Sequence, residues 1–143
     1  MTKDRVMLQA PKKLNAADIR TMPYPGFPTD MQAIFVSILC IAKGTSIVVE
    51  NIFENRYKYT NELQRMGAKI TIEGRTAVIK GVRKLNKATV QATDLRGGAA
   101  LVLAALSASG KTKITNIEYI LRGYENLDKK LNDLGANITK EVE

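Results

Sequence analysis

Residues 29–50 read TDMQAIFVSILCIAKGTSIVVE, and residues 93–116 read TDLRGGAALVLAALSASGKTKITN. Each stretch opens with Thr-Asp and continues as an apolar helical pattern, to about Lys43 in the first and about Ser109 in the second. A glycine follows each pattern, as is common just beyond a helix C-terminus. A run rich in β-branched residues follows each glycine and predicts a strand. The chain therefore contains two copies of one structural unit.

The segments after these strands also correspond. A short loop carries Arg56 in the first copy and Arg122 in the second. Apolar residues with helical spacing follow each loop and predict a second helix, which ends at Gly67-Ala68 or at Gly135-Ala136. The residues that define this helix are Tyr59, Leu63 and Met66 in the first copy and Leu127, Leu131 and Leu134 in the second.

Strands are predicted on both sides of these helices. One strand follows each Gly-Ala pair, at residues 69–72 and 137–140, and one precedes each Thr-Asp pair, at residues 18–22 and 89–92. In the first copy, a Glu-Gly turn leads to a hairpin partner at residues 77–80. The repeated unit is therefore β-α-β-α-β-β.

The fold class expected from this unit is α+β (α/β), with mixed sheets and helices packed on one face. The first copy spans about residues 18–82, and a shorter second copy spans about residues 86–143. Residues 5–9 are expected to be a strand left from a preceding unit. The first helix of each copy is apolar almost all round and is expected to be buried. Residues 1–143 are expected to form one domain.

Composition excludes several classes of function. The chain has 143 residues, no histidine and one cysteine, Cys40, which lies in an apolar run and is expected to be a packed core residue. We therefore expect no metal site, no cofactor and no disulfide within the chain. No segment is long and apolar enough to cross a membrane, and residues 1–5 lack the apolar core of a signal peptide, so the sequence predicts a cytoplasmic protein.

The net charge of +8 favours an anionic partner, either a phosphorylated small molecule or a nucleic acid. The basic residues are dispersed, and no aromatic residues alternate with them. Nucleic acid is therefore the less expected partner.

Asp30 and Asp94 occupy matching helix starts. Local sequence favours a capping role for both, and Thr29 with Gln32 fits a capping box. A carboxylate beside the proline-rich loop at residues 23–28 is also well placed for a site built from loops. Both interpretations remain open from the residues alone.

Three arginines are candidates for binding an anion. Arg56 and Arg122 occupy matching loops, where a guanidinium can hold a carboxylate or a phosphate or can simply lie at the surface. Arg96 lies in the first turn of a helix, where a cation opposes the helix dipole, so a nearby carboxylate such as Asp94 or an anionic ligand is expected. The Gly97-Gly98 pair in the same turn indicates close approach of another chain segment or a ligand.

The motifs of the chain resemble those of a known family, the UDP-N-acetylglucosamine enolpyruvyl transferases. They resemble those of the related shikimate-pathway (EPSP synthase-like) enzymes less closely. The matches extend over nearly the whole chain, in the order and spacing of the family. They are PYPGFPTDMQ at residues 23–32, FENR at 53–56, Glu62-Leu63 to Met66-Gly67-Ala68, ATDLR at 92–96 and RGYE at 122–125.

The resemblance implies a two-domain enzyme made of six β-α-β-α-β-β units, with this chain as part of one inside-out α/β barrel. The family transfers the enolpyruvyl group of phosphoenolpyruvate to the 3′-hydroxyl of UDP-N-acetylglucosamine, the first committed step of peptidoglycan synthesis. By resemblance, Asp30 is the base that contacts the attacking hydroxyl, and the backbone of Ile52 holds the nucleotide sugar. Arg122 binds phosphoenolpyruvate. The resemblance further implies that Arg56, Asp94 and Arg96 orient and close the site.

The resemblance covers only the C-terminal third of the family. The glycine-flanked reactive cysteine, its downstream arginine and an N-terminal Lys-Asn pair have no match in the chain. We therefore expect the isolated chain to be inactive and to act with the remaining N-terminal portion or to self-associate. The alternatives are a non-catalytic β-α-β-α-β-β module that binds an anionic ligand or RNA, and a purely structural module that self-associates.

Overall fold

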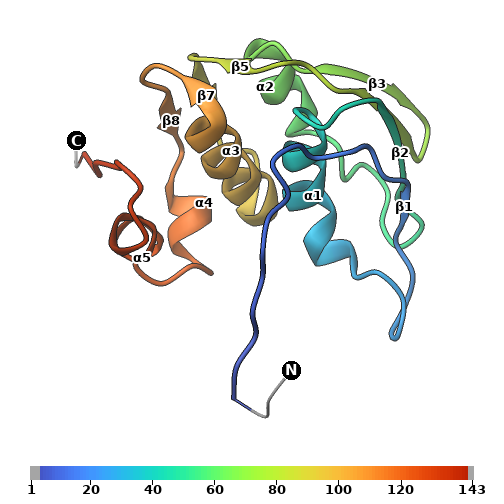
Figure 1. Cartoon of the computed structure of the whole chain (residues 1–143), viewed down its shortest axis with the longest axis horizontal. Coiled ribbons are helices and arrows are strands. Elements are labelled where there is room, and N and C mark those ends of the chain that lie inside the picture. Colours follow the sequence, from blue (N-terminus) through green and yellow to red (C-terminus); the bar gives the residue numbers. More distant parts are fainter. Residues whose placement is uncertain (1–3, 142–143) are drawn as a thin grey trace.

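The first copy forms a four-stranded mixed sheet. The computed structural model describes residues 4–141. The strand order is β1-β2-β4-β3 (Figure 1). Strand β1 (Ile19–Arg20) pairs in parallel with β2 (Thr45–Val49), and β2 pairs antiparallel with β4 (Thr76–Lys80). Strand β3 (Lys69–Glu73) completes the predicted hairpin with β4. The predicted mixed topology of this copy is confirmed.

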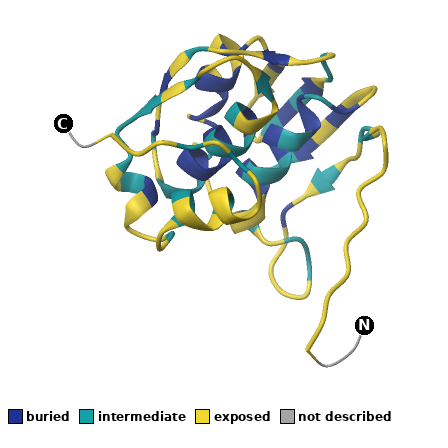
Figure 2. Ribbon diagram, turned by 60° about the vertical axis from the view of Figure 1, so that its left-hand side comes forward, coloured by how far each residue is buried: buried dark blue, intermediate teal, exposed yellow. Residues whose placement is uncertain are grey.

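One face of this sheet is buried. Side chains alternate along β2, so that Ser46 and Val48 point into the core while Thr45 and Ile47 are exposed. Helices α1 (Gln32–Leu39) and α2 (Thr60–Arg65) contribute to the same core. Figure 2 shows the buried residues concentrated on the inner helices and strands. The helices therefore pack on one face of the sheet, as expected.

The second copy pairs its strands two at a time. Its predicted first strand, β6 (Thr89–Gln91), pairs in parallel with β8 (Lys113–Thr115). A second parallel pair was not predicted from the sequence: β5 (Leu85–Asn86), where the first copy leads into the second, pairs with β7 (Ala108–Ser109), directly after the first helix of the second copy. The helices of this copy are α3 (Leu95–Ser107), α4 (Glu118–Leu121) and α5 (Leu127–Asp133).

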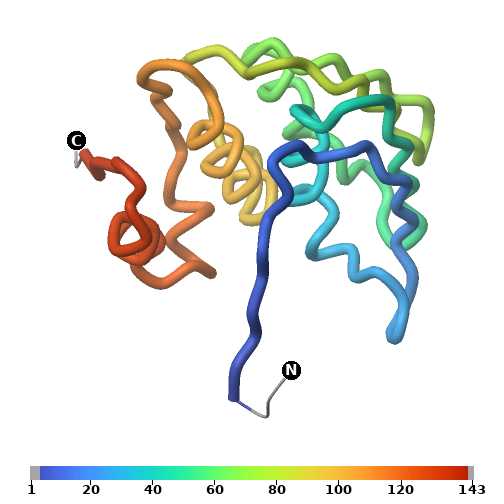
Figure 3. The backbone as a smooth tube through the Cα atoms, viewed as in Figure 1, coloured from blue at the N-terminus to red at the C-terminus, as the bar shows by residue number. Residues whose placement is uncertain are grey.

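Helices α1 and α3 lie side by side at the centre of the molecule (Figures 1 and 3). Small residues allow neighbouring segments to approach the start of α3. An added Cβ at Gly97 would lie 2.8 Å from Cβ of Tyr59, and one at Gly98 would lie 2.6 Å from Cγ1 of Ile120. The two glycines thus accommodate other segments of the chain, which confirms one of the two reasons expected for them.

Two predicted strands are wrong. Residues 137–140 form no strand, and neither do residues 6–9, where Val6, Met7 and Leu8 are largely exposed. A strand requires a partner for its backbone groups, and within the described residues neither segment has an adjacent strand with which to form a ladder. The N-terminal stretch instead runs away from the body of the molecule (Figure 3).

Helix boundaries also differ from the prediction. A 3₁₀ turn η1 (Thr29–Met31) precedes α1, which ends at Leu39 rather than near Lys43. The N–H groups of Ile41 and Ala42 bond to carbonyls three residues back, and the N–H of Lys43 bonds to Leu14 outside the helix. The short α4, which ends directly before Arg122, occupies the segment predicted as a loop. Among the described residues, no helix has the length and apolar character needed to cross a membrane.

Cys40 lies in the core, as predicted. Its side chain is fully buried, and burial raises the pKa of its thiol to about 12. A thiol in this setting stays protonated at neutral pH and packs as a small apolar group.

The close approach at Gly97 predicts that Gly97→Ala destabilises the chain. The new methyl group would meet Cβ of Tyr59, which is bonded to the backbone and cannot swing away. We expect a net loss of about 1–2 kcal/mol in the free energy of unfolding, because overpacking outweighs the better helix propensity of alanine. Urea unfolding followed by circular dichroism measures the loss. An unchanged or raised midpoint would contradict the packing described here.

Candidate functional site

Three of the predicted site residues, Asp30, Asp94 and Arg96, lie where the first helices of the two copies begin. Asp30 lies in η1, directly before α1, and Arg96 lies in the first turn of α3. The packing of α1 against α3 brings these two helix starts together. Side chains from both copies therefore meet at this end of the helix pair.

Asp30 and Arg96 form an ion pair between the two copies. Nε of Arg96 lies 2.5 Å from Oδ1 of Asp30, and the Asp30 side chain keeps 59% of its surface exposed. The hydrogen bond from Arg96 is the main cause that lowers the pKa of the Asp30 carboxyl. Burial opposes it, and the positive charges of Arg96 and Arg56 add smaller lowering contributions. Arg96 was expected to need a carboxylate or a ligand, and the carboxylate it contacts is Asp30 rather than Asp94.

Asp94 caps α3, as its local sequence predicted. Its Oδ1 accepts a hydrogen bond of 2.8 Å from the backbone N–H of Gly97, and its Oδ2 accepts one from the hydroxyl of Thr93. Its negative charge also helps to raise the pKa of Arg96, after the larger contribution of the hydrogen bond to Asp30. Asp94 thus fixes the helix start from which Arg96 extends.

The capping box predicted for Thr29 and Gln32 is wrong. The Thr29 hydroxyl donates to Oε2 of Glu50, and Oε1 of Gln32 accepts from the hydroxyl of Tyr59. Neither side chain caps the helix, because tertiary partners occupy both of them.

Arg56 and Arg122 differ in their surroundings. The Arg56 guanidinium lies over the ring of Phe53, 4.2 Å from its centroid, and is near enough to Asp30 to affect its pKa. Arg122 is exposed at the end of α4, with its guanidinium 5.4 Å from the centroid of the Tyr119 ring. No ion pair or hydrogen bond found in the described part of the chain links Arg122 to the other candidate residues.

The loop of Ile52 is held by a residue that sequence reasoning missed. Glu50 is 1% exposed, and its Oε1 accepts hydrogen bonds from the backbone N–H groups of Ile52 (2.9 Å) and Phe53 (3.2 Å). A signal for Glu50 was present in the sequence. Glu50 follows Ser46 and Val48 at a spacing of two residues at the end of β2, and this alternation predicts that its side chain points into the core.

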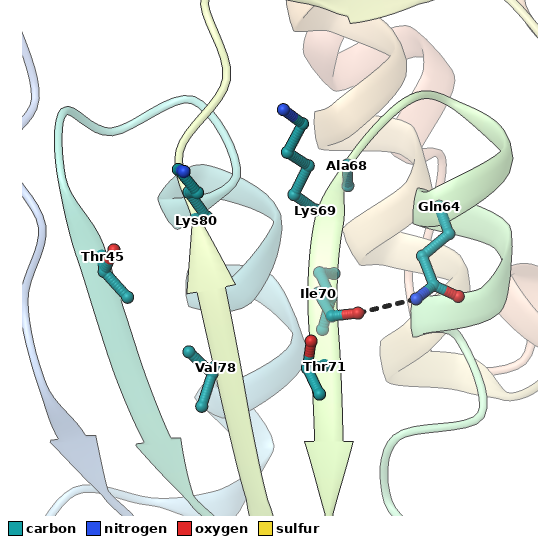
Figure 4. Close-up of a pocket in the computed structure, with 8 residues that line it drawn as sticks. All are labelled: Thr45, Gln64, Ala68, Lys69, Ile70, Thr71, Val78 and Lys80. Atoms are coloured by element: carbon teal, nitrogen blue, oxygen red, sulfur yellow. Dashed lines mark hydrogen bonds between the residues drawn. The ribbon is translucent and has the colours of Figure 1, made fainter.

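A shallow depression elsewhere on the molecule does not coincide with this site. It measures about 570 Å³ and lies over the sheet (Figure 4). Its lining residues are Thr45, Gln64, Ala68, Lys69, Ile70, Thr71, Val78 and Lys80. None of them is a predicted site residue. Among residues 4–141, no group of three or more His, Cys, Asp or Glu side chains is arranged to hold a metal ion.

Comparison with known proteins identifies the family. A family model described as EPSP synthase (3-phosphoshikimate 1-carboxyvinyltransferase) matches residues 1–131. The chain belongs to the EPSP synthase family. This finding confirms the resemblance to the enolpyruvyl transferases drawn from the sequence motifs.

Two relatives share the name UDP-N-acetylglucosamine 1-carboxyvinyltransferase. The protein from Desulfofundulus thermocisternus is 58% identical over 135 residues, which are 94% of this chain and 56% of that protein. The protein from Thermodesulfovibrio yellowstonii is 58% identical over 130 residues, which are 91% of this chain and 31% of that protein. The chain thus spans between about a third and just over half of the relatives it matches.

Solved structures of family members share the fold. The enolpyruvyl transferase NikO from Streptomyces tendae superposes with a TM-score of 0.81 at 28% identity, over 90% of this chain and 30% of that one. EPSP synthase from Acinetobacter baumannii gives a TM-score of 0.65 at 20% identity, over 79% of this chain and 27% of that one. The predicted α/β class with buried helices is therefore the fold of the family.

The ion pair predicts how Arg96→Gln changes the titration of Asp30. Removing the donor and the charge should move the pKa of Asp30 upward, toward its ordinary value. The carbon-13 shift of the Asp30 carboxyl, followed by NMR against pH in the full chain, measures this change. Arg83→Gln, at an exposed position after β4, is the matched control and should leave the titration unchanged.

The same variant has a stability consequence with a defined sign. Because the folded pKa of Asp30 is lowered, the pair stabilises the fold above the unfolded pKa, and that contribution disappears as pH falls through the folded pKa. Arg96→Gln should therefore lower stability at neutral pH by about 0.2–1 kcal/mol, as for exposed ion pairs, and by less at acid pH. An equal loss at both pH values, or an unmoved titration, would contradict the pairing.

Proposed function

We propose that this chain forms one part of a UDP-N-acetylglucosamine 1-carboxyvinyltransferase and supplies the base side of its active site. The observation that carries the proposal is the Asp30–Arg96 pair, a carboxylate held ionised between two copies of the unit. The names and identities of the relatives support the same reaction. The remaining portion of such an enzyme would supply the acid side.

The proposed reaction transfers the enolpyruvyl group of phosphoenolpyruvate to the 3′-hydroxyl of UDP-N-acetylglucosamine and releases phosphate. The attacking hydroxyl must lose a proton, and C3 of phosphoenolpyruvate must gain one. Asp30 is proposed to accept the hydroxyl proton, because its carboxylate is partly open to solvent and is held by Arg96 where the two copies meet.

The other candidate residues receive binding roles in this proposal. The backbone at Ile52 would hold the nucleotide sugar, and Arg122 would bind phosphoenolpyruvate, whose phosphate and carboxylate suit a guanidinium. Arg56, with Asp94 and Arg96, would orient the reacting groups. Arg56 and Arg96 both place positive charge beside Asp30, which supports their assignment to one site.

We propose that the partner of the chain is the remaining portion of the same enzyme. An apolar depression of about 150 Å³ lies between α1 and α3, lined by Leu14, Ser37, Ile38, Ile41, Leu103 and Ser107. The Thermodesulfovibrio yellowstonii relative continues well beyond the matched third and therefore has further polypeptide that could cover it. In this setting the protein would take part in peptidoglycan synthesis in the cytoplasm and so support cell shape and division.

A chimera tests the proposed function. In it, this chain replaces the matching third of the Thermodesulfovibrio yellowstonii relative. We expect phosphate release that depends on both substrates, and Asp30→Asn should lower kcat by about 10²–10⁴-fold, the usual range for loss of a general base. Asp133→Asn, at an exposed position on α5, is the matched control. An inactive chimera, or full activity of Asp30→Asn, would refute the proposal.

The chain alone is predicted to release no phosphate, because the acid side of the site lies outside the matched portion. Adding the separately produced remaining portion of the same relative should restore phosphate release. A coupled phosphate assay on the two preparations, separate and mixed, measures this. Turnover by the chain alone at a rate near that of the chimera would contradict the proposed division of the site.

A further inference from the structure

Glu50 forms a buried connection between three segments that meet at the candidate site. Its Oε1 accepts hydrogen bonds from the Thr21 hydroxyl (2.8 Å) and from the backbone N–H groups of Ile52 and Phe53. Its Oε2 accepts a hydrogen bond of 2.9 Å from the Thr29 hydroxyl. One carboxylate thus joins the end of β1, the turn that carries Asp30 and the loop that carries Ile52.

All four donors to Glu50 are neutral. None of the ion pairs found within residues 4–141 includes Glu50, although its side chain is almost fully buried. Burying a carboxylate away from a cation is unfavourable unless hydrogen bonds replace its lost hydration, and here the four donors do so. A less polar side chain at this position would leave the Thr21 and Thr29 hydroxyls and two backbone N–H groups without this acceptor, so Glu50 is what holds the three segments together.

The two oxygens of Glu50 serve different loops. Among residues 4–141, the one hydrogen-bond donor found for Oε2 is Thr29, the residue directly before Asp30. Oε1 holds the 51–53 loop. Thr21 adds to this hold, because its hydroxyl donates to Oε1 and also accepts a hydrogen bond of 2.8 Å from the backbone N–H of Asn51. The carboxylate therefore sets the spacing between the Asp30 turn and the 51–53 loop through two separable bonds.

We propose that Glu50 is a positioning residue that holds the Asp30 turn in register with the 51–53 loop, with Thr29 and Thr21 as the two halves of the connection. The proposal rests on the proposed function, in which Asp30 accepts the proton and the 51–53 loop holds the nucleotide sugar. Thr29 then acts on the chemical step, and Thr21 acts on sugar binding.

The two halves can be tested separately with isosteric substitutions in the chimera. Thr29→Val removes only the bond to Oε2 and should lower kcat by about tenfold, with KM for UDP-N-acetylglucosamine changed less than about threefold, because misplacing a reacting group slows the chemical step. Thr21→Val should instead raise that KM by about tenfold with a smaller change in kcat. Thr29→Ser and Thr21→Ser keep the hydroxyls and should restore the respective parameter.

The control is Thr71→Val, at an exposed position on β3 outside the site, which should change neither parameter. Equal effects of Thr29→Val and Thr21→Val on both parameters, or none beyond those of Thr71→Val, would overturn the proposal.

A second measurement separates failure of this proposal from failure of the proposed function. In the full chain, NMR hydrogen exchange should show faster exchange of the Asn51, Ile52 and Phe53 amides in Thr21→Val, by about tenfold for loss of one hydrogen bond. Thr29→Val should leave these amides unchanged. If the chimera is inactive, the proposed function fails, and the exchange data decide the positioning role: unchanged exchange in Thr21→Val overturns it.

Discussion

The packing of α1 against α3 is the contact on which the rest of the structure depends, because it fixes how the two copies of the unit sit against each other. The start of α3 admits Tyr59 and Ile120 only because Gly97 and Gly98 lack side chains. Glycine in a helix lowers stability by roughly 1 kcal/mol relative to alanine, so the sequence retains an unfavourable helix start that leaves room for Tyr59 and Ile120 against α3. The packing of α1 against α3 places the starts of two helices from different copies within reach of each other.

The candidate site follows from that placement. Asp30 lies in the turn directly before α1, and Arg96 lies in the first turn of α3. Their ion pair lowers the pKa of the Asp30 carboxyl. Asp94 holds the start of α3 through its cap, and Glu50 holds the turn of Asp30. A group that accepts a proton needs both an ionised form and a fixed position. The carboxylate comes from one copy and the arginine that pairs with it comes from the other, so the site needs both copies.

The sequence predicted the parts of this structure that depend on local pattern. The two buried helices, the β3–β4 hairpin, the cap at Asp94 and the buried Cys40 all follow from periodicity or from a few adjacent residues. The errors arose where a distant partner decides the outcome. Residues 137–140 have strand-forming side chains but no adjacent strand within the described chain. Thr29 does not cap the helix as expected, because its hydroxyl bonds to Glu50, 21 residues away. The choice of Asp30 as the partner of Arg96 is likewise a tertiary contact that no local pattern encodes.

A double-mutant cycle on Asp30 and Arg96 in the active chimera tests most directly whether residues from the two copies form one functional unit. The cycle compares kcat/KM for phosphate release in Asp30→Asn, Arg96→Gln and the double variant. If Arg96 acts largely through the Asp30 carboxylate, the loss in the double variant should be clearly smaller than the product of the two single losses. Losses that multiply would show that the two residues act independently, and would contradict a site assembled across the α1–α3 contact.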